Sequence, residues 1–179
     1  VIPFLDEVAE EARLIGAVNT IHFTPRGTMG YNTDMHGWVE DIEQDIALAG
    51  QSVCMIGTGG AAQAVSVGAC AAGIARLVTW DTRAEAADAL GARLRTRYPQ
   101  VRIEVLDAND DERREAMSQC AIVVNTTPVG MASLPGCPVP EEWLCPEHYV
   151  YDVIYTPAQT RLVAAARARG CRARSGLGM

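Results

Sequence analysis

The stretch SVCMIGTGGAA, residues 52–62, decides the fold expected for this chain. Its first five residues are typical of a buried strand, and the glycine-rich turn after them leads into an Ala-rich segment with helical spacing. The turn fits the pattern G-x-G-x-x-A, in which Gly57 permits a sharp turn, Gly59 lets the backbone approach a pyrophosphate, and Ala62 allows close helix packing. A helix N-terminus also favours phosphate charge. The stretch predicts a dinucleotide site, with a glycine turn in another kind of α/β domain as the alternative.

On the C-terminal side of this turn, apolar runs alternate with amphipathic segments, which is the pattern of β-α-β units. The expected strands cover residues 52–56, 76–80, 101–106, 121–125 and 150–154. The expected helices cover residues 60–72, 84–98, 110–118 and 158–169. Thr82 and Glu85 have the spacing of a capping box for the second of these helices. We therefore expect an α/β fold with a Rossmann-type parallel sheet and helices on both faces.

The first 49 residues have a different pattern. We expect a helix over residues 4–15, extended segments at 17–23 and 29–32, and a long helix over 34–48. This part is interpreted as the edge of a separate α/β unit, which the long helix joins to a dinucleotide-binding domain at residues 50–179. Because the chain starts with Val1 and without a signal-peptide pattern, we also expect that it begins within a longer protein.

Charge and composition exclude several function classes. The 15 basic and 22 acidic residues give a net charge of −7, which argues against nucleic acid or an anionic membrane surface as a partner. Every basic residue is Arg, so these residues contain no P-loop lysine, Schiff-base lysine or lysine acid/base. No segment has the length and hydropathy of a membrane span. The six cysteines lack zinc-site spacing, so we expect no metal, reduced thiols and a cytoplasmic location.

Asp81 follows Gly57 by 24 residues, at the end of the second expected strand. A carboxylate in this position can accept hydrogen bonds from the adenosine ribose hydroxyls. It would repel the 2′-phosphate of NADP as a like charge, so NAD is favoured over NADP. The guanidinium of Arg83 could reach such a phosphate and permit some use of both cofactors. The alternative is that Asp81 only helps Thr82 to cap the next helix.

Six strings of the sequence carry a family resemblance. They are GAVNT (16–20), GYNTD (30–34), GTGGAA (57–62), NTTPVGM (125–131), DVIYTP (152–157) and GLGM (176–179). In this order, and over nearly the whole chain, they resemble shikimate dehydrogenase and its quinate/shikimate dehydrogenase relatives. The resemblance implies a two-domain, cytoplasmic enzyme of aromatic amino acid biosynthesis. Such an enzyme interconverts shikimate, or quinate, and its 3-dehydro ketone by hydride exchange with NAD(P), in a cleft between the domains.

The resemblance also assigns site residues. Asn19 would contact substrate hydroxyls, Asp34 would pair with a catalytic lysine beside the reacting end of the ring, and Tyr155 would reach toward the substrate. Residues 1–49 would then be the remnant of a substrate-binding domain. The family's cofactor contacts after the last strands fall on Thr127, Pro128, Val129, Val153, Gly176 and Met179. The glycine turn and the end of the second strand add Gly57, Gly59, Gly60, Ala61, Asp81, Thr82 and Arg83.

Each of these assignments has a purely structural alternative. Asp34 at the start of an amphipathic helix is a common N-cap, Asn19 could tie a turn, and Tyr155 could be a core phenol. We interpret Asp152 as structural. The arginines between residues 161 and 174 are interpreted as a solvated face near a helix C-terminus. The three histidines share no ligand or triad spacing.

Two departures from the family pattern limit what this chain is expected to do. Most shikimate dehydrogenases carry Asn-Arg-Thr where this chain has Asp81-Thr82-Arg83, and an acidic residue there resembles the NAD-using branch. The family's catalytic lysine and carboxylate-binding serines lie upstream of residue 16. With Asp34 alone, we expect dinucleotide binding but poor turnover. The alternative is a non-catalytic NAD-binding module. The expected partner is a small-molecule substrate, and the protein is a monomer or homodimer.

Overall fold

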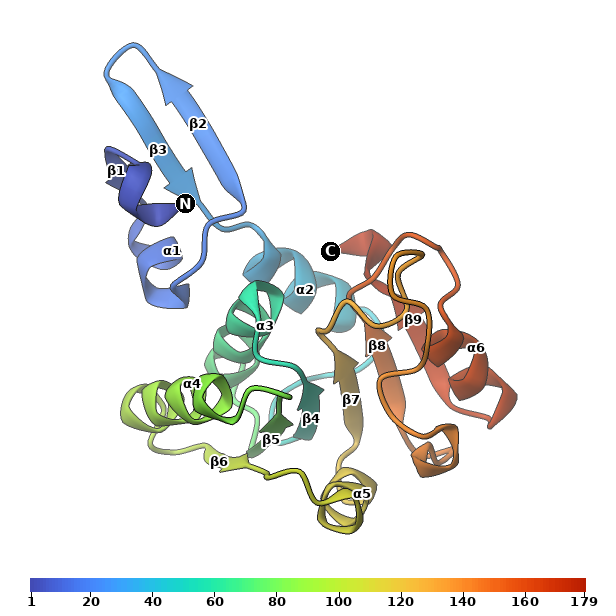
Figure 1. The fold of residues 1–179 in the computed structure, drawn as a ribbon. Coiled ribbons are helices and arrows are strands. Elements are labelled where there is room, and N and C mark those ends of the chain that lie inside the picture. The colour runs from blue at the N-terminus through green and yellow to red at the C-terminus, as the bar shows by residue number, and fades with distance from the viewer.

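The computed structural model describes residues 1–179, which form two β-sheets (Figure 1). The larger sheet contains β4 (Ser52–Ile56), β5 (Arg76–Trp80), β6 (Arg102–Val105), β7 (Ile122–Asn125), β8 (Tyr149–Asp152) and β9 (Arg172–Ser175). Its strand order is β6-β5-β4-β7-β8-β9, and every neighbouring pair is parallel. Counted from β4, this is the order 3-2-1-4-5-6 of a Rossmann fold. The fold class predicted from the sequence is confirmed.

Helices cover both faces of this sheet because its strands alternate apolar side chains between two cores. The helices that follow the glycine turn are α3 (Gly60–Ala71), α4 (Ala84–Arg97), α5 (Asp110–Ser118) and α6 (Arg161–Ala168). Val53 and Met55 of β4 face the core that α3 and α4 complete. Cys54 and Ile56 face the core formed with α5 and α6. The four inner strands are therefore buried on both faces, as in other parallel sheets, whereas the edge strands β6 and β9 are partly exposed.

The N-terminal residues form a small mixed sheet, whose hairpin projects away from the large one (Figure 1). Its elements are a 3₁₀ turn at Ile2–Phe4, β1 (Glu7–Val8), α1 (Glu10–Ile15), β2 (Thr20–Thr24) and β3 (Gly27–Tyr31). β1 pairs in parallel with β3, which pairs in antiparallel with β2. The helix predicted over residues 4–15 is wrong in its first half. The side chain of Asp6 accepts hydrogen bonds from Thr28, which draws this segment into the sheet.

Helix α2 (Asp34–Ile42) connects the two sheets and packs on α3. Trp38 and Ile42 are fully buried in the core of the large sheet, and the Trp38 ring meets Tyr151 of β8 edge to face. The predicted helix ran to residue 48, but a turn follows Ile42, and Leu48 enters the same core beyond it. None of the helices has the length and apolar character that crossing a bilayer requires.

The starts of two helices differ from the expectations, and one strand was not expected. The side chain of Thr82 does not cap α4, whose N-cap is Arg83 without a side-chain hydrogen bond. Helix α6 begins three residues later than predicted because Thr160 accepts a hydrogen bond from the Val163 amide and caps it there. The cysteines are all unpaired, and four of the six are buried. Strand β9 was not expected at all.

Candidate cofactor and substrate site

A cavity of about 480 Å³ opens at the carboxyl ends of β4, β5 and β7. Ligands of open α/β sheets bind at this place, where the strand order reverses between β4 and β7. Its lining includes eight of the residues predicted for the cofactor: Gly57, Gly59, Asp81, Thr82, Arg83, Thr127, Pro128 and Val129. The structure therefore brings most of the predicted cofactor residues together around one hollow.

The glycine turn leaves its backbone open toward this cavity. Gly57 has φ +96°, and a Cβ atom there would lie 2.8 Å from Cγ2 of Thr127. Gly59 is the N-cap of α3 and Gly60 its first residue, and a Cβ atom at either position would meet nothing within 4 Å. Free amides at the start of a helix form a ready binding place for a phosphate group. Ala62 is fully buried, as expected for close packing of α3 on the sheet.

Asp81 ties the end of β5 to the glycine turn. Its Oδ2 accepts hydrogen bonds of 2.8 Å from both the amide and the hydroxyl of Thr58, and its Oδ1 accepts one of 2.9 Å from the Arg83 amide. Burial favours the neutral acid, but these hydrogen bonds outweigh it and lower the pKa of Asp81 to about 2. The side chain is therefore an anion that faces the cavity. It fixes the shape of the turn rather than serving with Thr82 as a helix cap.

Two arginines line the cavity, and only Arg83 was expected there from the sequence. Arg83 lies at the mouth, where its side chain is 68% exposed and its Nε is 3.5 Å from Asp81. Arg113 reaches the same cavity from α5, with its guanidinium carbon 5.4 Å from the ring centroid of Trp80. No sequence signal distinguished Arg113, because α5 has the pattern of a charged surface helix and its contact with Trp80 depends on the tertiary fold.

A buried hydrogen-bond network holds the loop that follows β7. Asn125 donates to Oδ1 of Asp152 at 2.9 Å and to the Val129 carbonyl at 3.1 Å, and it accepts from the Thr127 hydroxyl at 2.7 Å. Asp152 in turn accepts a 2.6 Å hydrogen bond from Thr160 at the start of α6. The interpretation of Asp152 as structural is confirmed. Asn125 is a positioning residue that the sequence analysis did not identify.

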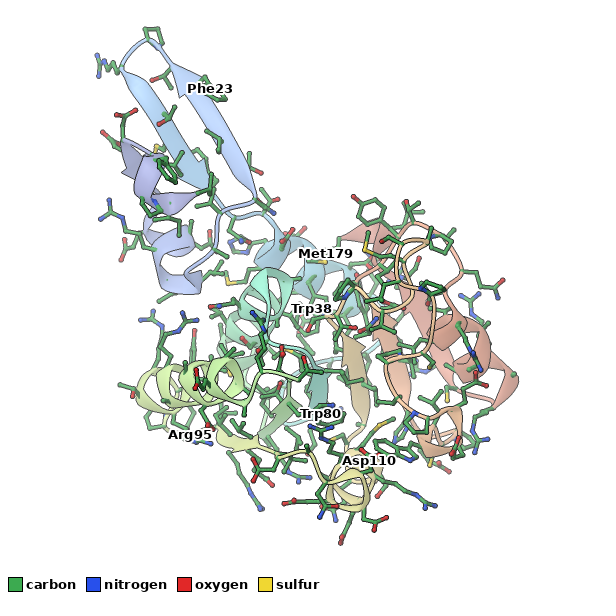
Figure 2. All side chains as sticks on the ribbon, in the orientation of Figure 1. Phe23, Trp38, Trp80, Arg95, Asp110 and Met179 are labelled. Atoms are coloured by element: carbon green, nitrogen blue, oxygen red, sulfur yellow. The ribbon has the colours of Figure 1, made fainter.

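Of the three residues predicted beside the nicotinamide, Gly176 contacts Val153 and Met179 contacts α2. The backbone of Gly176, in a short 3₁₀ turn at Gly176–Gly178, packs so closely on the Val153 carbonyl that no side chain would fit. The same turn brings Met179 onto Gly37, where a Cβ atom would lie 2.8 Å from the Met179 backbone. Figure 2 shows Met179 beside α2. The C-terminal residues therefore lie one helical turn from Asp34.

Asn19 and Asp34 form a hydrogen-bonded pair at the start of α2. Nδ2 of Asn19 donates to Oδ1 of Asp34 at 2.6 Å, and its Oδ1 accepts from the Thr33 amide at 3.1 Å. The interpretation of Asp34 as the N-cap is wrong, because Thr33 occupies that position and Asp34 is the first helical residue. Its carboxylate projects toward Asn19 instead. The two polar groups that the sequence assigned to the substrate therefore lie together.

Tyr155 does not contact this pair through a hydrogen bond. Its side chain is 61% exposed, so the alternative interpretation as a core phenol is wrong. It follows Val153 by two residues in the loop after β8, and its hydroxyl forms no hydrogen bond with Asn19 or Asp34. The predicted contact of Tyr155 with a substrate therefore stays a prediction.

Comparison with known proteins relates the whole chain to one group of dehydrogenases. No protein-family model matches it. It is 39% identical over 182 residues to shikimate dehydrogenase (NADP(+)) of Symbiobacterium thermophilum, and 36% identical over 181 residues to quinate/shikimate dehydrogenase (NAD(+)) of Corynebacterium efficiens. Both alignments cover 100% of this chain, but only 62% and 63% of those proteins. The chain thus spans less than two thirds of the length of these relatives.

A solved structure also matches the fold over nearly the whole chain. Shikimate 5-dehydrogenase from Listeria monocytogenes, in complex with shikimate and NAD, superposes with a TM-score of 0.86 at 27% sequence identity. The match covers 99% of this chain and 63% of that one. Both the small sheet and the six-stranded sheet therefore have counterparts in a protein that was crystallised with a dinucleotide and a hydroxy acid.

Proposed function

We propose that the protein is an NAD(P)-dependent oxidoreductase. The whole chain is similar to shikimate and quinate/shikimate dehydrogenases, which supports this proposal. The reaction would interconvert shikimate, or quinate, and the 3-dehydro ketone by hydride transfer. The observation that carries this proposal is the cavity at the carboxyl ends of β4, β5 and β7, which combines free helix N-terminal amides with an anionic Asp81. We assign residues 50–179 to the cofactor domain and 1–49 to the edge of the substrate-binding domain with the connecting helix.

The residues around the cavity divide the work of holding the cofactor. The open amides at Gly59, Gly60 and Ala61 would bind the diphosphate, and Asp81 would accept hydrogen bonds from the adenosine ribose. Thr127, Pro128 and Val129 would form the opposite wall. Val153, Gly176 and Met179 would flank the nicotinamide, because they lead from the sheet toward α2. When bound, the nicotinamide supplies or accepts the hydride.

Asp34 is the proposed catalytic group among these residues. Its carboxylate and the Asn19 amide form a 2.6 Å pair, so both can bind hydroxyl groups of a polyhydroxylated ring at one place. Oxidation of an alcohol also requires that the hydroxyl proton leave, and a positioned acid or base contributes a factor of about 10² to 10⁴ to such a step. We assign this proton transfer to Asp34 together with a lysine outside these residues. Tyr155 would complete the substrate contacts.

Asp81 favours NAD over NADP. Its pKa of about 2 keeps the carboxylate charged at neutral pH, where it would repel a 2′-phosphate. Arg83 acts in the opposite direction, since its exposed guanidinium can turn toward such a phosphate. Titration of the protein with NADH and NADPH tests the balance. We expect tighter binding of NADH, and equal or tighter binding of NADPH would remove the argument from Asp81.

The activity itself is tested by assaying the full-length protein with shikimate and quinate, each with NAD and with NADP. We expect cofactor reduction with at least one of the two alcohols. The variant Asp34→Asn should lower the rate by at least a factor of 100 while NADH binding stays unchanged. If both alcohols are inert while NAD still binds, the protein is instead a non-catalytic NAD-binding module.

Cellular context and assembly follow from the same proposal. Six unpaired cysteines, four of them buried, are typical of a reducing compartment, which supports a cytoplasmic location. The substrate would be a small hydroxy acid. Either a monomer or a homodimer is compatible with the cavity, because every residue that we assign to it comes from one chain.

A further inference from the structure

We propose that Arg113 forms the wall of the cavity against which the adenine ring of the cofactor binds. The inference rests on the proposed function, since it takes a dinucleotide to occupy this cavity. Arg113 would be a cofactor-binding residue on α5, a helix for which no role was expected from the sequence. Arg113 would act on the part of the cofactor that NAD and NADP share.

The position of Arg113 follows from the order of groups in a bound dinucleotide. With the diphosphate at the start of α3 and the ribose at Asp81, the base must lie beyond Asp81, on the side of the cavity away from the glycine turn. Beyond the glycine turn and residues 126–129, the lining includes Trp80, Arg113 and two residues from farther along the loop after β7, Leu134 and Pro138. These are apolar surfaces and one flat cation, which together suit a planar heterocycle.

The guanidinium of Arg113 is held in place without forming a strong bond to the protein. It lies over Trp80, and Figure 2 shows Trp80 at the α5 side of the sheet. Its Nε is buried and has no hydrogen-bond partner. The nearest carboxylate, on exposed Asp110, is 3.9 Å from Nη1, which is beyond hydrogen-bonding distance. The terminal Nη groups, which form no hydrogen bond within the protein, therefore remain free to donate to a ligand in the cavity.

A fixed guanidinium is well suited to recognise a purine. Its plane stacks on aromatic bases, and its outer N–H groups can donate to ring nitrogen atoms. Because only 15% of the Arg113 side chain is exposed, little conformational freedom remains to be lost on binding.

Arg113 and Arg83 therefore have separable effects. Arg83 is exposed at the mouth beside Asp81, where the 2′ substituent of the ribose would lie. Arg113 lies deeper, against the base. Loss of Arg113 should weaken NADH and NADPH to the same extent, whereas a residue that reads the 2′-phosphate would change the ratio between them.

The test compares Arg113→Met and Arg113→Lys with Arg114→Met, a matched change at the adjacent, exposed residue of α5 outside the cavity. Dissociation constants for NADH, NADPH and ADP-ribose are measured by fluorescence or calorimetric titration of the purified protein. We expect both Arg113 variants to weaken all three ligands about tenfold, since a retained positive charge does not replace the guanidinium plane. Arg114→Met should change them less than about twofold.

Two results would overturn this inference, and a third would overturn the proposed function on which it rests. Unchanged affinities in a folded Arg113 variant, as judged by its thermal melt, would overturn it. A loss confined to NADPH would also overturn it, because Arg113 would then contact the 2′-phosphate. If the unaltered protein binds none of the three ligands, the proposed function fails before Arg113 is tested. The lysine variant keeps the test valid should the methionine variant not fold.

Discussion

The two sheets of this protein differ in how completely their surfaces are covered. In the six-stranded sheet, neighbouring residues such as Val53 and Cys54 of β4 enter opposite cores, and both are fully buried. In the small N-terminal sheet, Phe23 is 76% exposed, and Phe4, just before β1, is 86% exposed. Figure 2 shows Phe23 on the projecting hairpin. The large sheet therefore completes its own core within these residues, whereas the small one presents apolar side chains to its surroundings.

Their polar groups differ in the same way. Around the cofactor cavity, Asp152 and Asp81 each accept three or more hydrogen bonds from inside the protein. At the small sheet, the Asn19–Asp34 pair is open to solvent. The difference indicates that the proposed cofactor site is held in shape by internal hydrogen bonds, whereas the pair proposed to contact the substrate is exposed to solvent.

The largest expected effect comes from breaking the internal network of the large sheet. Asp152→Ala removes the acceptor for Asn125, Thr160 and the Ile154 amide, which are buried around it. Unsatisfied buried donors cost about 1–3 kcal/mol each, so we expect a loss of at least about 3 kcal/mol in the free energy of unfolding. Urea denaturation measures it, with exposed Asp107→Ala as the control. Equal stability of the two variants would contradict the network.

A second pair of variants distinguishes the effect of backbone strain on stability from the effect of a blocked cavity on NADH binding. Gly57 and Gly50 both have positive φ, but only at Gly57 would a Cβ atom meet other residues, namely Thr126 and Thr127. We expect Gly57→Ala to cost about 2 kcal/mol and to weaken NADH at least tenfold, and Gly50→Ala to cost about 1 kcal/mol with unchanged binding. Thermal melts and NADH titrations measure both effects. Normal NADH affinity in Gly57→Ala would exclude the glycine turn from the site.

Asp81→Asn should produce a smaller effect that depends on the cofactor. Loss of a charged acceptor weakens NADH about tenfold, while NADPH loses less because the repulsion of its 2′-phosphate is relieved. The pKa of Asp81 lies at about 2 in the folded protein, below its usual 3.8. Its contribution to stability is therefore present above about pH 4 and is lost as pH falls toward 2. A variant that prefers NADH as strongly as the original protein would refute the role of Asp81.

The smallest effect is expected in the small sheet. Phe23→Thr replaces an exposed side chain with another residue that favours strands, so the free energy of unfolding should change by less than about 0.5 kcal/mol. Trp38→Phe, in the buried core, is the comparison and should cost at least about 1 kcal/mol. A loss above about 1 kcal/mol for Phe23→Thr would contradict the exposure of this side chain.

The large sheet was predictable because its apolar runs are buried on both sides. The bounds of β4, β5 and α5 agree with those expected from the sequence. Strand β9 escaped prediction because Arg172–Ser175 has no apolar run. It is held by contacts with distant residues: Arg174 donates to the Asp41 carbonyl, and Arg172 lies over Tyr149. Arg172 is nevertheless exposed, as the solvated face predicted for these arginines requires, whereas Arg174 is partly buried and pairs with Asp41, so the prediction is wrong for Arg174.

Predictability of the site followed a similar rule. The glycine turn and Asp81 could be found because their spacing along the chain reflects one β-α-β unit. Asn125 and Arg113 could not, since their partners Asp152 and Trp80 lie in other strands and become neighbours only through the sheet order. In the N-terminal part, β1 forms through pairing with β3, whose residues lie about 20 positions away. A local helical pattern could not reveal that pairing.

The most direct test of the account is a crystal structure of the protein with NAD bound. We predict density for the diphosphate at the amides of Gly59 and Gly60, for the adenosine ribose at Asp81, and for the adenine ring in the cavity of about 480 Å³ between β5 and the loop after β7. A dinucleotide bound away from this cavity, or no binding at millimolar NAD in well-ordered crystals, would contradict the assignment on which the proposed function rests.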